Sequence, residues 1–204
     1  MTVSKWTLTA FVIFIGAVLT FFGTKALSQV LVDHQHKKLT RPDEKVEPLE
    51  IVEAKADGER VPFDSSFDRE GDWLKDFSVT YRNKTGRTIV SMTVLLLFPE
   101  TKGPNGIETF PISFGTPRMA ALAGDRSTVI KPGDLLTVTM TPTNYDRMKK
   151  FVETKQSLRS ISEVEVQVTF ILFDDGTAWA GQYRIPDPQK PNRWMVDPKQ
   201  VVKP

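Results

Sequence analysis

The sequence predicts a mainly β domain of two packed sheets, preceded by one membrane-spanning helix. Nineteen residues without a charge lie between Lys5 and Lys25. After residue 46, apolar residues recur at every second position in several short segments, and Gly, Pro and Asp separate these segments. Period two is typical of strands that bury one face, and about seven short strands with turns between them favour a sandwich of two sheets.

The apolar stretch at residues 6–24 has the length of a transmembrane helix. At about 1.5 Å per residue it spans roughly 28 Å, close to the thickness of the hydrocarbon core. Trp6 stands at one edge, where aromatic side chains favour the membrane interface. Residues 1–25 are therefore predicted to be an anchor that contacts membrane lipid through residues 6–24.

Retention and orientation of this segment stay open. Residues 26–28 form a small-x-small triplet, so a signal peptide cleaved after Ser28 is the alternative. Positive charge lies mostly on the carboxyl side of the apolar stretch, which favours a cytoplasmic domain, whereas Lys5 and a short leading tail are typical of export. We expect a single-pass membrane protein with an extracytoplasmic domain, periplasmic or at the cell surface.

Residues 26–47 are polar and are predicted to form a juxtamembrane stalk. His34 and His36 lie two apart, a spacing that would point them away from each other on a helix. They are therefore interpreted as solvated residues and not as a metal pair.

Residues 48–185 contain the predicted strands. The most regular strand is 163–173, and its expected buried face consists of Val164, Val166, Val168, Phe170 and Leu172. Residues 77–81 and 88–98 are predicted to form a hairpin around the turn at Asn83-Lys84-Thr85-Gly86. The second arm has an apolar face of Val90, Met92, Val94, Leu96 and Phe98.

Further strands are expected at 49–54, 108–114, 135–141 and 178–185, the last joined to 163–173 by a hairpin turn at Asp174-Asp175-Gly176-Thr177. One short helix is predicted from Pro142 or Asn144 to Gln156, because Thr141 offers a cap and a core face recurs at helical spacing. That face consists of Tyr145, Met148, Phe151 and Val152.

Residues 186–204 begin with closely spaced prolines and are predicted to form an extended tail. Trp194 is expected to pin this tail to the domain. As an alternative, a tryptophan close to prolines could contact a ligand.

The run Phe77-Ser78-Val79-Thr80-Tyr81-Arg82-Asn83-Lys84-Thr85-Gly86-Arg87-Thr88-Ile89, with Ile130-Lys131-Pro132-Gly133-Asp134 before another strand, resembles bacterial domains of the FxLYD type. Those domains are small, commonly membrane-tethered modules of the cell envelope. The resemblance covers roughly residues 76–140. It implies an immunoglobulin-like two-sheet β-sandwich, and no catalytic residues come with it.

Absent residue types exclude several kinds of chemistry. The chain has no cysteine, and both histidines precede residue 46. Ser-His-Asp and Cys-His nucleophilic sites and thiolate or imidazole metal sites are therefore not expected in the domain. No glycine-rich phosphate loop is present, so no cofactor is predicted. Acidic and basic residues nearly balance after residue 46, which argues against nucleic-acid binding.

Carboxylates are the remaining candidates for catalysis. Asp64, Asp68, Glu70 and Asp72 cluster, but their spacing does not match an EF-hand and Arg69 intrudes, so no metal is predicted. This cluster, or the pair Asp174 and Asp175, could serve a glycosidase-like envelope hydrolase. That is the alternative function.

We predict a non-catalytic, membrane-tethered binding or assembly module of the envelope, with a protein or glycan partner and an oligomeric state that stays open. The candidate binding surface consists of Phe114, Met119, Leu122, Trp179 and Trp194.

Overall fold

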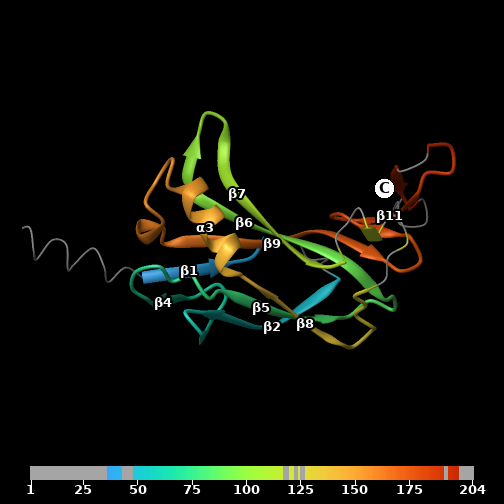
Figure 1. Cartoon of the computed structure of the whole chain (residues 1–204), viewed down its shortest axis with the longest axis horizontal. Helices are drawn as coiled ribbons and strands as arrows, with labels where there is room; N and C mark the ends of the chain where they lie inside the picture. Colours follow the sequence, from blue (N-terminus) through green and yellow to red (C-terminus); the bar gives the residue numbers. More distant parts are fainter. Residues whose placement is uncertain are drawn as a thin grey trace, which may run out of the picture.

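Two β-sheets, one of eight strands and one of four, make up most of the described chain (Figure 1). The computed structural model describes residues 36–42, 48–116, 120–121, 124, 127–190 and 193–197. The predicted mainly β fold with two sheets is confirmed. The described residues form twelve strands where about seven are expected, and four of these span three residues or fewer, too short for their periodicity to be recognised.

The large sheet is centred on β6 and β9, which pair antiparallel. Strand β7 pairs with the other side of β6. The other side of β9 pairs in parallel with β1 near one end and antiparallel with β10 near the other. Beyond β1 the sheet continues with β4, and beyond β10 it continues with β11 and then β12. The bounds are β1 His36–Thr40, β4 Ser66–Asp68, β6 Ile89–Gly103, β7 Gly106–Gly115, β9 Glu163–Phe173, β10 Ala178–Trp179, β11 Tyr183–Pro186 and β12 Trp194–Val196.

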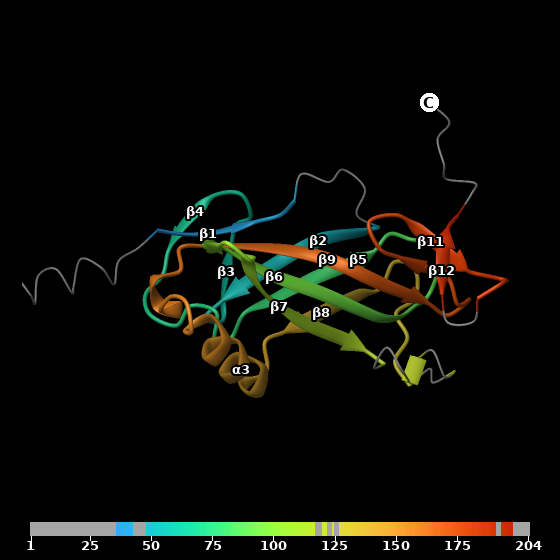
Figure 2. The same ribbon diagram turned by 90° about the horizontal axis from the view of Figure 1, so that it is seen from above.

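The small sheet has the order β3-β2-β5-β8 and is antiparallel throughout. Apolar side chains of both sheets share one buried core. Figure 2 shows helix α3 at the opposite end of the molecule from β11 and β12. The bounds are β2 Leu49–Ala56, β3 Glu59–Val61, β5 Ser78–Asn83, β8 Leu135–Thr139 and α3 Pro142–Val152.

The predicted hairpin between residues 77–81 and 88–98 is wrong, because β5 and β6 belong to different sheets. The Asn83 side chain donates to the carbonyls of Arg87 and Ile130 and accepts from Thr85. These bonds fold the turn so that the chain crosses from the small sheet to the large one. In contrast, the predicted hairpin after β9 is confirmed at its turn, where β10 pairs antiparallel with β9. Its second arm, predicted as one strand over 178–185, is two strands, because the chain turns after β10 and β11 pairs back onto β10.

Two β-bulges correct the predicted alternation in the central strands. The pairing of β6 with β9 shifts between Ile89 and Ser91, and again opposite Thr169. Each bulge adds one residue and so reverses the faces beyond it. Phe170, Leu172 and Val90 therefore leave the main core and contribute to a second apolar cluster on the other face of the sheet.

Helix α3 confirms the predicted helix, although it ends at Val152. Thr141 caps it by accepting a hydrogen bond from the Asn144 amide. Tyr145, Met148 and Val152 are buried, as predicted. Phe151 is predicted on the same core face but is 43% exposed, so this part of the prediction is wrong. At 100° per residue, Phe151 lies at the margin of the stripe that the other three define.

The folded domain begins before residue 48, since His36–Thr40, predicted as part of the stalk, forms β1. Leu39 is fully buried, and alternation across this short segment places Lys37 on the same side. Within the described residues, no helix is long and apolar enough to cross a membrane. The predicted anchor at 6–24 and the cleavage position at Ser28 lie outside the described residues.

Candidate functional site

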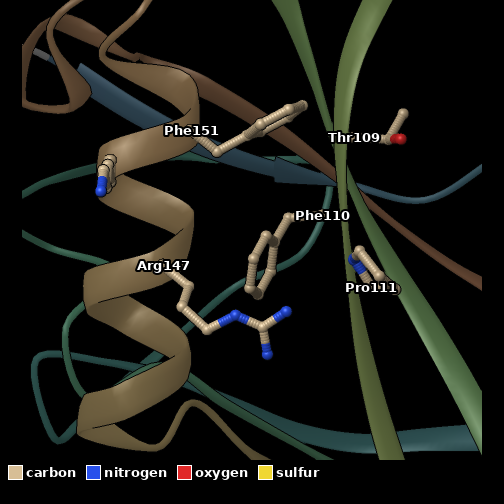
Figure 3. A pocket seen from close by; sticks show the side chains of 6 residues that line it. Thr109, Phe110, Pro111, Arg147 and Phe151 are labelled. Carbon is tan, nitrogen blue, oxygen red and sulfur yellow. The ribbon is translucent and has the colours of Figure 1, made fainter.

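A groove of about 430 Å³ lies between α3 and β7, and we refer to it as the α3–β7 groove (Figure 3). Its lining combines apolar and cationic side chains. Strand β7 contributes Thr109, Phe110 and Pro111, and α3 contributes Arg147, Lys150 and Phe151.

The helix side of the groove is a basic and aromatic stripe. Residues 147, 150 and 151 are spaced at i, i+3 and i+4 and so share a face beside the buried stripe of α3. All three are exposed. Arg147 and Lys150 form no ion pair with any described residue, whereas Lys149 pairs with Asp72. The groove therefore carries two cations that are free to meet an anion.

The strand side supplies the apolar floor. Figure 3 shows Phe110 pointing from β7 toward the helix, between Arg147 and Phe151. Only 7% of Phe110 is exposed, and its side chain lines the groove. Thr109 and Pro111 lie on the far side of the strand.

The outer edge of β7 has no partner strand, because among the described strands β7 pairs with β6 alone. The Thr116 amide donates to the Val90 carbonyl at 3.0 Å, and hydrogen-bonded and non-bonded pairs alternate along an antiparallel ladder. The backbone groups of Thr109 and Ser113 should therefore point to the free edge. Pro111 lies between them without an N–H, which is the position that an edge strand tolerates.

Asp72 holds α3 in place beside the groove. Its carboxylate lies 3.2 Å from Lys149 Nζ and 3.4 Å from Arg159 Nε. Burial opposes its ionisation, but the Tyr145 hydroxyl and the two cations hold the pKa of Asp72 below its usual range. Burial, and next the Asp72 carboxylate, raise the pKa of Tyr145, so its hydroxyl stays protonated. The ion pair with Lys149 ties α3 to Asp72 beside the groove.

The candidate residues from the sequence do not gather at this groove. Trp179 is 2% exposed and lies in the main core, and Phe114 is half-buried against that core. Trp194 lies at the other end of the large sheet, where its indole N–H donates to the Gly176 carbonyl at 3.2 Å. This contact ties the tail to the domain, as predicted. Met119 and Leu122 lie outside the described residues.

The carboxylates considered for hydrolysis have separate partners. Asp64 pairs with Arg41 at 3.0 Å, and Asp68 pairs with His36 at 2.7 Å. Asp175 accepts hydrogen bonds from the Thr177 amide and hydroxyl, which is the expected turn geometry. Across the described ranges there is no group of three or more side chains suited to hold a metal ion.

Sequence reasoning missed Arg147, Lys150 and Phe110 as site residues. The spacing of 147, 150 and 151 is a signal for a helical stripe that could have been recognised. No pattern in the sequence near β7 indicates that this strand lies beside the stripe, because its position depends on which strands pair in each sheet.

No protein-family model and no curated protein matches the chain. Among solved structures, the fold comparison finds a hypothetical protein from Peptoclostridium difficile 630, which is 10% identical in sequence. The alignment covers 67% of this chain and 87% of that one, with a TM-score of 0.33.

Proposed function

We propose that this chain is a non-catalytic, membrane-tethered binding module of the cell envelope, in which an immunoglobulin-like β-sandwich offers the α3–β7 groove to a protein partner. One observation carries the proposal: exposed Phe151 and two unpaired cations line a hollow with an apolar floor. Exposed aromatic and arginine side chains around a pocket are typical of interface hot spots.

The partner segment is proposed to be extended and acidic. Carboxylates would meet Arg147 and Lys150, whose charges are not neutralised within the described domain. The free edge of β7 offers backbone groups to an added strand, a common way of binding extended peptides. Apolar side chains at alternate positions of the segment would cover Phe110 and Phe151.

The shape of the groove favours a peptide over a membrane surface as its occupant. A flat bilayer could contact Phe151, which is 43% exposed, but could not reach the floor at Phe110, which is 7% exposed. A peptide, unlike a flat surface, can place single side chains into a hollow and so contact its floor.

Binding of two designed peptides by the full chain in detergent micelles tests the proposal. Labelled peptides of alternating Val and Glu, or of alternating Val and Lys, are compared by fluorescence anisotropy. We expect saturable binding of the Glu peptide, weakened by salt because the charges involved are exposed. The Lys peptide should bind at least about tenfold more weakly, since like charges at a contact are strongly disfavoured.

Charge reversal provides the matched variant. Arg147→Glu with Lys150→Glu should exchange the preference, so that the Lys peptide binds better. Lys131→Glu with Lys190→Glu makes the same change in net charge at exposed positions outside the groove and should keep the original preference. Equal effects of both pairs, or binding of anionic phospholipid vesicles but neither peptide, would show that the groove is not a peptide site.

Hydrogen exchange separates strand addition from simple contact. The Glu peptide should slow amide exchange at Thr109 and Ser113, whose N–H groups are expected at the free edge. If it slows exchange only in α3, the peptide binds the helix without joining the sheet.

A further inference from the structure

A second hollow, of about 420 Å³, lies where residues of β11 and β12 meet residues of β6 and β9. Figure 2 shows β11 and β12 at the opposite end of the molecule from α3. We refer to this hollow as the bulge pocket. Its size is in the range of small-molecule sites. It is lined by Thr93, Thr169, Phe170, Ala180, Arg184 and Trp194.

The bulge at Thr169 creates this pocket. Thr93 pairs with Phe170 and Val94 with Val168, which leaves Thr169 as the extra residue. Beyond it, Phe170 turns away from the main core and contacts Trp194 edge to face, with ring centroids 6.1 Å apart. Trp194 is itself held by its hydrogen bond to Gly176. A bulge that redirects a side chain in this way is a frequent feature of binding sites.

The polar side of the pocket is Arg184, on β11. Its Nε is buried without a hydrogen-bond partner, and its guanidinium forms no ion pair with any residue that the structure describes. A buried donor of this kind is costly unless something accepts from it. Thr93 and Thr169 add two hydroxyl groups, of which that of Thr169 donates to the Thr93 carbonyl at 3.3 Å.

We propose that the bulge pocket binds a carboxylated sugar unit. A guanidinium matches the geometry of a carboxylate and binds it with charge-assisted hydrogen bonds. The C–H face of a sugar ring is apolar and would pack against Trp194 and Phe170. The threonine hydroxyls would bond to sugar hydroxyls. This inference does not depend on the α3–β7 groove.

Three small probes test the ligand class on the full chain in detergent micelles. Sodium glucuronate, glucose and sodium acetate are titrated by calorimetry, with protein NMR to locate the site. Glucuronate should bind saturably. Glucose lacks the carboxylate and acetate lacks the ring, so each should bind at least about tenfold more weakly. If acetate binds as well as glucuronate, or if glucuronate does not saturate, the proposal is wrong.

Variants of the arginine show whether the pocket is responsible. Arg184→Gln should abolish the preference for glucuronate over glucose, while Arg184→Lys, which keeps the charge and most of the side chain, should retain part of it. Arg193→Gln is the control, because Arg193 is exposed and does not line the pocket. A preference unchanged in Arg184→Gln, or lost equally in Arg193→Gln, would overturn the assignment.

Discussion

Lys37 shows at the scale of one residue how a polar sequence can conceal a core position. It lies in a segment predicted as stalk, yet it is 1% exposed. Its ammonium group donates to the carbonyls of Arg159 and Ile161, both at 2.9 Å. These bonds join β1 to the 3-10 turn Leu158–Ser160. Lys37 supplies a donor to the part-buried Arg159 carbonyl, whereas the Ile161 carbonyl also accepts from the Trp73 indole N–H at 3.2 Å.

Replacing Lys37 with Met should therefore destabilise the domain although it adds an apolar side chain. An acceptor left without a donor costs about 1–3 kcal/mol, so loss of the bond to the Arg159 carbonyl should lower the free energy of unfolding, measured in urea, by about 1–3 kcal/mol. Lys38→Met on the same strand, where the side chain is half-buried, should change stability by less than about 0.5 kcal/mol. Similar losses from both would contradict the role given to Lys37.

Gly115 is required where β7 ends beside the first bulge of β6. Its φ is +82°, and a Cβ would lie 2.7 Å from the Val90 carbonyl oxygen. Gly115→Ala combines the cost of a left-handed conformation, about 1–2 kcal/mol, with a clash against backbone. We expect a loss of more than about 2 kcal/mol in chemical unfolding.

The matched control is Gly133→Ala, because Gly133 has a φ of +85° with open space around its Cβ position. Gly133→Ala should lower the free energy of unfolding only by the cost of the left-handed conformation, without the cost of a clash. Should the two variants prove equally stable, the close approach to Val90 carries no weight.

At the scale of elements, the Asp72 carboxylate joins the loop before β5 to α3 through its ion pair with Lys149. Its pKa is lower in the folded chain than its usual value of 3.8. Ionised Asp72 therefore stabilises the fold above that pH, and the contribution disappears as the pH falls through the lower folded pKa.

Asp72→Asn should reduce stability by about 1 kcal/mol at neutral pH, since the ion pairs involved are partly solvated. The difference in free energy of unfolding between Asp72→Asn and the natural chain should shrink as the pH falls below about 4. Urea unfolding across this pH range measures it. Asp76→Asn changes an exposed position of the same loop, and its free energy of unfolding should equal that of the natural chain at every pH. A constant difference for Asp72→Asn would show that its charge is not involved.

At the scale of the whole molecule, α3, which lines one hollow, and β11 and β12, which line the other, lie at opposite ends of the domain (Figure 2). Strand β1 begins at the end that carries α3 (Figures 1 and 2). If residues 6–24 are inserted in a bilayer as predicted, the chain enters the domain at the end that carries α3, and the bulge pocket lies at the other end (Figure 2). A tethered module with this layout would present its two sites to different neighbours.

Membrane insertion can be tested by placing charge inside the predicted anchor. Ile13→Arg with Ala17→Arg adds roughly 3 kcal/mol per arginine to the cost of insertion, so more of the chain should be released from membranes by an alkaline wash. Thr2→Arg with Ser4→Arg adds the same charge outside the apolar stretch and should not release it. Equal release would argue against a spanning helix. Protease protection in intact cells then determines on which side the domain lies.

The sequence by itself determined where most long strands and the helix lie, because alternation, capping and turn residues act within a few positions. It also determined the absence of cysteine and of histidine after residue 36, which limits the chemistry. Tertiary structure alone decided that Lys37 is buried, that Phe170 turns outward at a bulge, and that β7 lies beside α3. These features depend on the partner strand that each segment finds, and a local pattern carries no information about a partner distant in sequence.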